Sequence, residues 1–222
     1  MRTKREIASV ILKLIVAVAA AVGVTLSASS NGFMGRGTVW LFFTIQSNVW
    51  MAVTCLIGLY FVLKHKTITR AMYLIKLVFT VSITLTGVVF CFVLAPTFVG
   101  NPWNLQNILT HVVVPVLSVV DFFVFDSSFA YQYKDSVWVV IPPIYYAIFA
   151  GIGYVCKWNF GGGVNYPYFF LNWGSPAGAF GFSDTLPFMG VMWWILAISI
   201  FLIIVGLVYV FLARVIRKAL KK

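Results

Sequence analysis

Six apolar runs, each of roughly 20 residues or more, restrict the fold of this chain more than any other feature. An α-helix of that length crosses about 30 Å of hydrocarbon, because each residue adds about 1.5 Å. The runs are residues 7–28, 37–63, 72–95, 107–125, 136–156 and 189–213. Lipid cannot satisfy unpaired backbone groups, and the runs lack the alternation of a membrane barrel. We therefore predict an all-α polytopic membrane protein, a bundle of six transmembrane helices.

The spans and their short connections use almost all of the 222 residues, which predicts a single transmembrane domain over residues 1–222. A content of 62% hydrophobic and 9% charged residues lies outside the range of soluble domains. The first run follows basic residues, as in a signal peptide. It is long enough to span from Ile7 to Leu26, so we expect it to be retained. Lys13 within it is expected to extend to the cytoplasmic surface.

The net charge of +11 is distributed very unevenly. Six spans place both termini on one side of the membrane, and 14 of the 16 lysines and arginines fall on that side, against Arg36 and Lys157 on the other. Cytoplasmic loops are enriched in these residues, so both termini are predicted to be cytoplasmic. Anionic phospholipid headgroups at the cytoplasmic face are then the partners of the basic ends, and nucleic acid is not expected as a partner. The predicted location is the cell (plasma) membrane.

Polar side chains gather in the stretch "LFFTIQSNVW", residues 41–50, inside the second apolar run. Thr44, Ser47 and Asn48 share one helical face there. If the span starts near Thr38, Thr44 lies about 9 Å below its outer end, and His111 lies about 6 Å inside the fourth span. The two residues are therefore predicted at similar depth on different helices. His111 is the only histidine in any predicted span.

Two interpretations of this polar cluster are open. Such side chains often form hydrogen bonds between membrane helices. Alternatively, an imidazole can accept the proton of a neighbouring hydroxyl, which would make Thr44 a catalytic nucleophile and His111 its base. Ser47, Asn48 and Asn107 are then candidates for binding the substrate or a developing oxyanion. The residue types and their spacing do not decide between the two.

Asp121 lies ten residues beyond His111, or about 15 Å deeper along the same helix, which is too far to orient the imidazole. We interpret it as a structural or gating carboxylate that pairs with Lys76 or with nearby hydroxyl groups. The three cysteines lie in different spans without C-x-x-C spacing, at Cys55, Cys91 and Cys156. Neither a disulfide framework nor a metal site is indicated, and no cofactor is expected.

The compositions of two further segments predict features of their structure. The long connection from Lys157 to Pro187 combines glycines with many aromatic residues, so it is expected to fold back onto the bundle, as a lid or as an aromatic belt. Adjacent prolines at Pro142 and Pro143 predict a kink in the fifth span.

Three separated segments resemble a bacterial family of six-span integral membrane proteins. These are "FFTIQSN" at 42–48, "LTHVVVPVLSVVDFFVF" at 109–125 and "YPYFFLNW" at 166–173. That family is related to the eukaryotic androgen-induced protein and androgen-dependent tissue-factor-pathway-inhibitor-regulating protein, intramembrane threonine hydrolases that cleave fatty acid esters of hydroxy fatty acids. The resemblance implies Thr44 as nucleophile, His111 as base and a membrane lipid ester as substrate. The alternatives are a non-catalytic protein that binds or transports a lipid or small molecule, and a structural protein with a hydrogen-bonded polar core.

Overall fold

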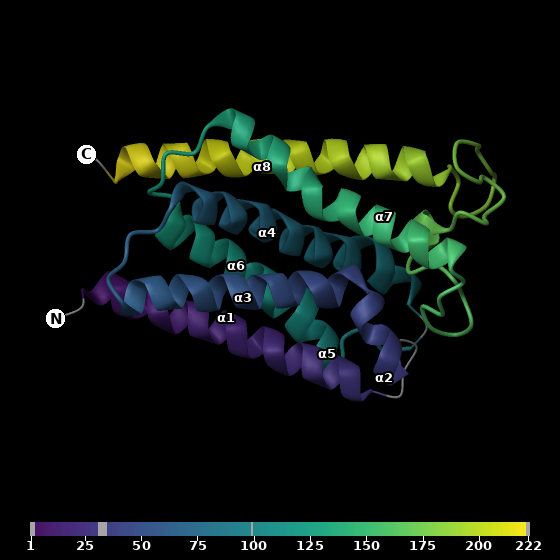
Figure 1. Cartoon of the computed structure of the whole chain (residues 1–222), viewed down its shortest axis with the longest axis horizontal. Helices are drawn as coiled ribbons and strands as arrows, with labels where there is room; N and C mark the ends of the chain where they lie inside the picture. The colour runs from purple at the N-terminus through teal and green to yellow at the C-terminus, as the bar shows by residue number, and fades with distance from the viewer. Residues whose placement is uncertain (1–2, 31–34, 99, 221–222) are drawn as a thin grey trace.

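A computed structural model describes residues 3–30, 35–98 and 100–220. Within these residues, six helices are long and apolar enough to cross a membrane, and the only β-pairing is an isolated bridge between Phe182 and Met189 (Figure 1). The spans are Lys4–Ser29, Phe43–Leu63, Arg70–Thr97, Leu105–Asp126, Tyr133–Val155 and Val191–Ala219. The predicted all-α membrane bundle of six helices is confirmed.

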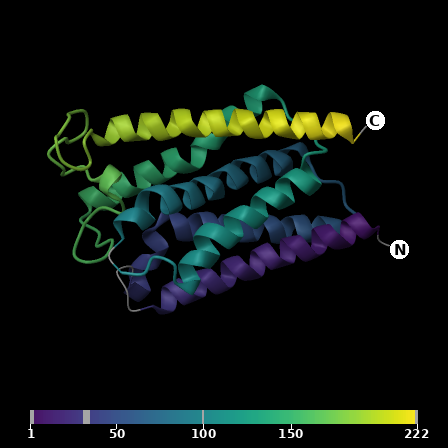
Figure 2. The same ribbon diagram turned by 180° about the vertical axis from the view of Figure 1, so that it is seen from behind.

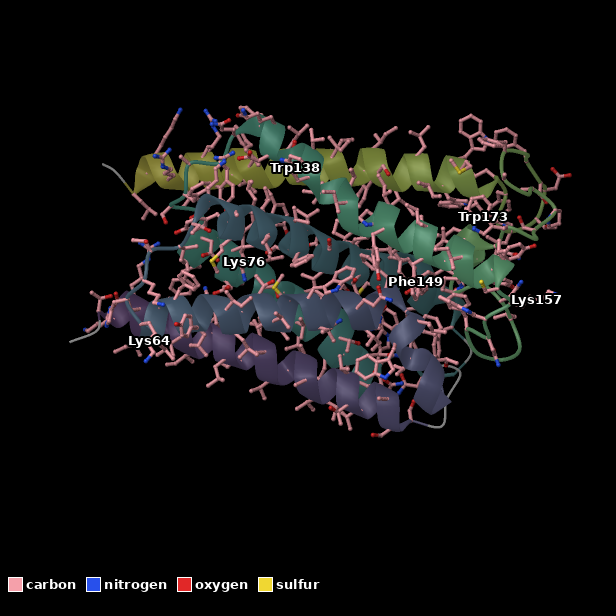
Figure 3. All side chains as sticks on the ribbon, viewed as in Figure 1. Lys64, Lys76, Trp138, Phe149, Lys157 and Trp173 are labelled. Atoms are coloured by element: carbon pink, nitrogen blue, oxygen red, sulfur yellow. The ribbon has the colours of Figure 1, made fainter. Side chains whose placement is uncertain are left out.

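All but the second of the named helices make up these spans, together with short 3₁₀ and π turns. They are α1 (Lys4–Ser29), α2 (Gly35–Thr38), α3 (Phe43–Leu63), α4 (Arg70–Val89), α5 (Leu105–Ile108), α6 (Val114–Asp121), α7 (Ile141–Val155) and α8 (Val191–Ala219). Both ends of the chain lie at the same end of the bundle (Figures 1 and 2). Lys64 lies at that end and Lys157 at the opposite end (Figure 3). Arg2, Lys221 and Lys222, which belong to the basic ends, lie outside the described residues.

Helix α4 lies between the other spans and contributes to two buried clusters. One cluster joins α4 to α7, α8 and the end of the fourth span, through Leu77, Phe122, Tyr146 and Leu202. The other joins α4 to α1, α3 and α6, through Val16, Met51, Ile83 and Val114. The outward faces keep large apolar side chains exposed, as a surface against lipid requires. On α8, the longest helix, these include Leu196, Ile200, Ile204, Val208 and Phe211.

The second span begins six residues later than the sequence predicts, at Phe43 instead of residue 37. Helix α2 and a 3₁₀ turn, Val39–Leu41, precede it, and the extended backbone of Phe42 separates them from α3. The Tyr146 hydroxyl of α7 donates a hydrogen bond to the Leu41 carbonyl at 2.9 Å and holds this break in place. Thr44 therefore lies in the first turn of α3, where amide groups have no carbonyl partner within the helix.

The fifth span changes helix type at the position of the predicted kink. A 3₁₀ helix, Tyr133–Val140, precedes α7, and Pro142 and Pro143 lie in the first turn of α7. Proline is tolerated there because the first amide groups of a helix have no carbonyl to bond. The prolines thus mark where α7 starts.

The connection between α7 and α8 packs against the bundle, as expected. Phe160 is fully buried, and a 3₁₀ turn at Phe169–Leu171 buries Phe170 and Leu171. The ring of Tyr168 makes an edge contact with Phe42, and the two ring centroids are 6.0 Å apart. This loop therefore reaches the start of α3, where Thr44 lies.

Candidate functional site

Thr44 and His111 meet inside the bundle. The Thr44 hydroxyl oxygen lies 3.3 Å from Nε2 of His111, and both residues are buried. The sequence predicts the two residues at similar depth, and the structure brings their side chains within hydrogen-bonding distance. The contact joins the first turn of α3 to the fourth span, two segments that are 67 positions apart in sequence.

The imidazole of His111 is oriented by its own helix. Nδ1 lies 3.1 Å from the Asn107 carbonyl oxygen and 3.0 Å from the Thr110 hydroxyl. Because a carbonyl can only accept, Nδ1 carries the proton, which leaves Nε2 free to accept one from Thr44. Phe90 stacks on the ring with centroids 3.8 Å apart, and it fixes the plane of the imidazole. The tautomer assigned from these partners is the one that a general base requires.

The local backbone at His111 follows from Pro115, four residues later. An α-helix would bond the amide of residue 115 to the His111 carbonyl, and proline has no such amide. The chain instead forms a π turn over Leu109–Val113, in which the Val114 amide bonds to Leu109. Helix α4 passes closely at Gly87, where an added Cβ would lie 2.9 Å from the His111 carbonyl oxygen. The H-x-x-x-P spacing thus has a physical role in shaping this turn.

Ser47 and Asn48 were predicted as donors to a substrate or oxyanion, but the structure uses their donors elsewhere. The Ser47 hydroxyl lies 3.0 Å from the Thr44 carbonyl and 2.8 Å from the Thr86 hydroxyl. The Asn48 amide donates to the carbonyls of Thr44 and Thr110, at 2.8 and 3.1 Å. Both side chains therefore connect helices, and neither is among the residues that line the cavities at Thr44.

Asn107 contributes to the site through its backbone. Its side-chain amide donates to the Pro102 carbonyl at 2.9 Å, while its own carbonyl orients His111. Asn107 also lines a cavity of about 510 Å³, together with His111 and Thr44. Of the three candidates for substrate binding, it is the one that the structure places at the cavity.

A second, smaller cavity of about 60 Å³ meets the first at Thr44. Thr44, Leu94 and Tyr168 line both cavities. We call the larger one the outer cavity and the smaller one the inner cavity. Thr44 therefore borders both cavities, although it is almost fully buried.

Tyr168 is a site residue that the sequence analysis did not identify. It comes from the long connection and lies within the segment "YPYFFLNW". Burial raises the pKa of its hydroxyl, and hydrogen-bonding groups at Thr44 and Phe43 partly oppose this rise. The hydroxyl therefore stays protonated at neutral pH and lies next to the Thr44 side chain. The dense aromatic composition of the loop was the signal that could have found it.

Asp121 lies apart from the cavities, in a buried cluster of charges. Its two carboxylate oxygens accept hydrogen bonds from Lys13 at 2.7 Å and from Lys76 at 2.6 Å. The predicted pairing with Lys76 is confirmed, but the expectation that Lys13 extends to the surface is wrong. The stem of Lys13 packs over Gly58 of α3, and its ammonium points inward to Asp121 and Asp126. Opposite charge within reach holds the side chain inside the bundle.

Over the described part of the chain, no group of three or more histidine, cysteine, aspartate or glutamate side chains could hold a metal ion. The fold and the contact between Thr44 and His111 define a six-helix membrane protein with a buried threonine–histidine pair, in which Thr44 borders two cavities. Searches of protein-family models, of curated proteins and of solved structures found no match to this chain.

Proposed function

We propose that this chain is an intramembrane hydrolase of lipid carboxylic esters of the fatty-acyl type, with Thr44 as nucleophile and His111 as base. The observation that carries the proposal is the 3.3 Å contact between the Thr44 hydroxyl and Nε2 of His111. Nucleophilic catalysis by a hydroxyl needs a base at this range, and resting enzymes often show it slightly longer than in the reacting complex. The resemblance of the three segments to threonine hydrolases supports the same reaction class.

The reaction follows from the positions of these groups. The Thr44 oxygen attacks the ester carbonyl carbon while its proton passes to Nε2 of His111. The bond from that carbon to the alcohol oxygen then breaks, and the leaving alkoxide takes the proton from His111. A water molecule attacks the acyl-threonine by the same route, which releases the carboxylic acid and restores the Thr44 hydroxyl.

Donors to the developing oxyanion come from the start of α3 and from the loop. The first-turn amides of Phe43 and Thr44 have no carbonyl partner within the helix. In the resting structure, the protonated hydroxyl of Tyr168 is the hydrogen-bond partner of the backbone at these two residues, a place that a substrate oxygen would take. In this proposal the amides and the Tyr168 hydroxyl stabilise the oxyanion, which is the role that the sequence suggested for Ser47 and Asn48.

The orientation and location of the protein belong to the same proposal. The predicted cytoplasmic position of both termini would place Thr44 and His111 in the outer half of a bacterial plasma membrane. Anionic headgroups would contact the basic ends, and a lipid substrate would enter the site from the membrane.

The test compares Thr44→Ala and His111→Ala with Thr54→Ala, which removes a hydroxyl from the same helix as Thr44 but lines neither the outer nor the inner cavity. A lipophilic fluorophosphonate should label the wild type and Thr54→Ala. Labelling and ester hydrolysis should be lost in Thr44→Ala, and hydrolysis should fall by about 10²–10⁴ in His111→Ala. Retention of hydrolysis in both site variants would reject the proposal. If lipid binding persisted in a wild type without labelling or hydrolysis, the result would favour the alternative of a non-catalytic lipid-binding or transport protein.

A further inference from the structure

The two cavities that meet at Thr44 differ in chemistry, and this difference bears on the substrate. The following inference rests on the proposed hydrolase function. The outer cavity presents polar side chains, among them Asn104, Gln106 and His111. The inner cavity is lined mainly by apolar side chains of α4, α7 and α8, including Val89, Ala147 and Ile195. An ester bond placed at Thr44 would therefore have one side in polar and one in apolar surroundings.

The inner cavity is also small. A cavity needs about 10–15 Å³ for each water-sized sphere, so its volume of about 60 Å³ corresponds to roughly four to six such positions. A straight alkyl segment has the width of one methylene group and fits such a space. A ring or a branched chain is wider than a straight chain. A close-packed protein interior cannot make room for the extra width without strain.

The position of His111 decides which part of the ester occupies which cavity. His111 lines the outer cavity, whereas Thr44 lines both. The leaving alcohol must take its proton from His111, and the attacking water must later give its proton to the same nitrogen. Both events take place on the outer side. Between these two events, the acyl group stays bound to Thr44. Because the alcohol and the water use the outer side, the acyl group occupies the inner cavity.

We propose that the inner cavity is the acyl-chain pocket of this protein and that it selects esters whose acyl chain is unbranched over its first few carbons. The alcohol part of the ester occupies the outer cavity. Ala147 determines this specificity, because it lines the cavity and a larger side chain at that position of α7 would fill its small volume. Thr44, Leu94 and Tyr168 surround the carbonyl carbon where the cavities meet.

A pair of isomeric substrates tests the pocket. The 4-nitrophenyl esters of hexanoic acid and of 4-methylpentanoic acid have the same number of carbons and similar intrinsic reactivity. Wild type should prefer the straight chain by about tenfold or more, the discrimination that a methyl group meets in a tight apolar pocket. In Ala147→Phe, the ratio of hexanoate to acetate hydrolysis should fall by about tenfold. Ile148→Phe adds the same ring to the lipid-facing side of α7, and it should leave that ratio unchanged.

A binding measurement separates this inference from the proposed reaction. A non-hydrolysable hexanamide with a terminal diazirine should cross-link to α7 near Ala147 and to α8 at residues 195–199. Ala147→Phe should abolish this cross-linking, and Ser199→Phe provides a second filled pocket in case the first variant does not fold. If cross-links fall in the inner cavity but no ester is hydrolysed, the pocket stands and the hydrolase proposal fails. Hydrolysis that depends on Thr44, with cross-links confined to the outer cavity or the lipid face, would overturn the pocket. If neither cross-links in the inner cavity nor ester hydrolysis is observed, the acyl pocket and the hydrolase proposal are both rejected.

Discussion

The ammonium of Lys13 and the carboxylate of Asp121 lie 2.7 Å apart in the interior of the bundle, although they are 108 positions apart in sequence. Lys76 binds the second oxygen of the same carboxylate at 2.6 Å. One carboxylate therefore links α1, α4 and α6. Two buried ammonium groups depend on it, since a charge without a partner is very costly away from water.

Replacement of the shared carboxylate should destabilise the protein strongly. Asp121→Asn keeps the size of the side chain but leaves Lys13 and Lys76 without their main counter-charge. The free energy of unfolding should fall by about 3–5 kcal/mol, as for other broken buried pairs. Unfolding in mixed detergent micelles measures it. Lys64→Met, which removes an exposed lysine, serves as the control. A variant as stable as wild type would show that the cluster does not hold the helices together.

The Ser47–Thr86 hydrogen bond should contribute to stability and not to catalysis. The two hydroxyl oxygens lie 2.8 Å apart between α3 and α4. A double-mutant cycle of Ser47→Ala and Thr86→Ala should give a coupling energy of about 0.6 kcal/mol, the average for such bonds in membranes. Fluorophosphonate labelling of Thr44 should continue in Ser47→Ala. Loss of labelling in a folded Ser47→Ala protein would instead indicate that Ser47 has a role in the reaction.

Removal of the Tyr168 hydroxyl should slow the chemical step. Tyr168→Phe keeps the ring and should lower kcat by about 10²-fold, the usual effect of losing one oxyanion donor, with little change in KM. Tyr145→Phe, which changes an exposed tyrosine on α7, is the matched control. Equal kcat values in Tyr168→Phe and wild type would exclude Tyr168 as a donor.

The pH profile gives a second measurement on the same hydroxyl. Burial raises the pKa of Tyr168 above its ordinary value of about 10, so the group is neutral and able to donate throughout the neutral and mildly alkaline range. Ionisation of Tyr168 should therefore not lower the wild-type rate below about pH 10. In that range, wild type and Tyr168→Phe should show the same pH dependence. A decline between pH 8 and 10 that the substitution removes would contradict this assignment.

Gly87 should be required for the position of His111. An added Cβ would lie 2.9 Å from the His111 carbonyl oxygen and 3.1 Å from Pro115, so Gly87→Ala must push α4 away from the fourth span. We expect a loss of about 1–3 kcal/mol in unfolding free energy, together with reduced hydrolysis. Gly37→Ala is the control, since an added Cβ there meets no atom within 4 Å. Wild-type behaviour of Gly87→Ala would show that the two helices can separate without cost.

The predicted orientation can be tested with reporter fusions. Reporters after Lys66, after Trp103 and at the C-terminus should indicate the cytoplasm, the exterior and the cytoplasm, as the distribution of lysine and arginine predicts. The same three fusions in a variant with added lysines in the loop around Trp103 provide a control for the charge effect. An external C-terminus would reverse the orientation and place the Thr44–His111 pair in the inner half of the membrane.

The six-helix membrane fold and the common depth of Thr44 and His111 can be predicted from the amino-acid sequence alone. Both follow from quantities that are local along the chain. Apolar length sets whether a helix can cross the bilayer, and a rise of about 1.5 Å per residue sets how deep each side chain lies. The start of the second span was misjudged because Phe42 is apolar, and hydropathy does not reveal an extended residue.

Which polar groups face the cavities and which connect helices depends on how the helices pack against one another. Ser47 and Asn48 lie on the same helical face as Thr44, yet both donate to backbone carbonyls, and the Ser47 hydroxyl also shares a hydrogen bond with Thr86. Lys13 turns inward because Asp121 is close to it in space. Tyr168 reaches the site from a loop without any helical period. A local pattern fixes the depth and face of a residue on its own helix, but the rotation of each helix against its neighbours follows from packing across the whole bundle.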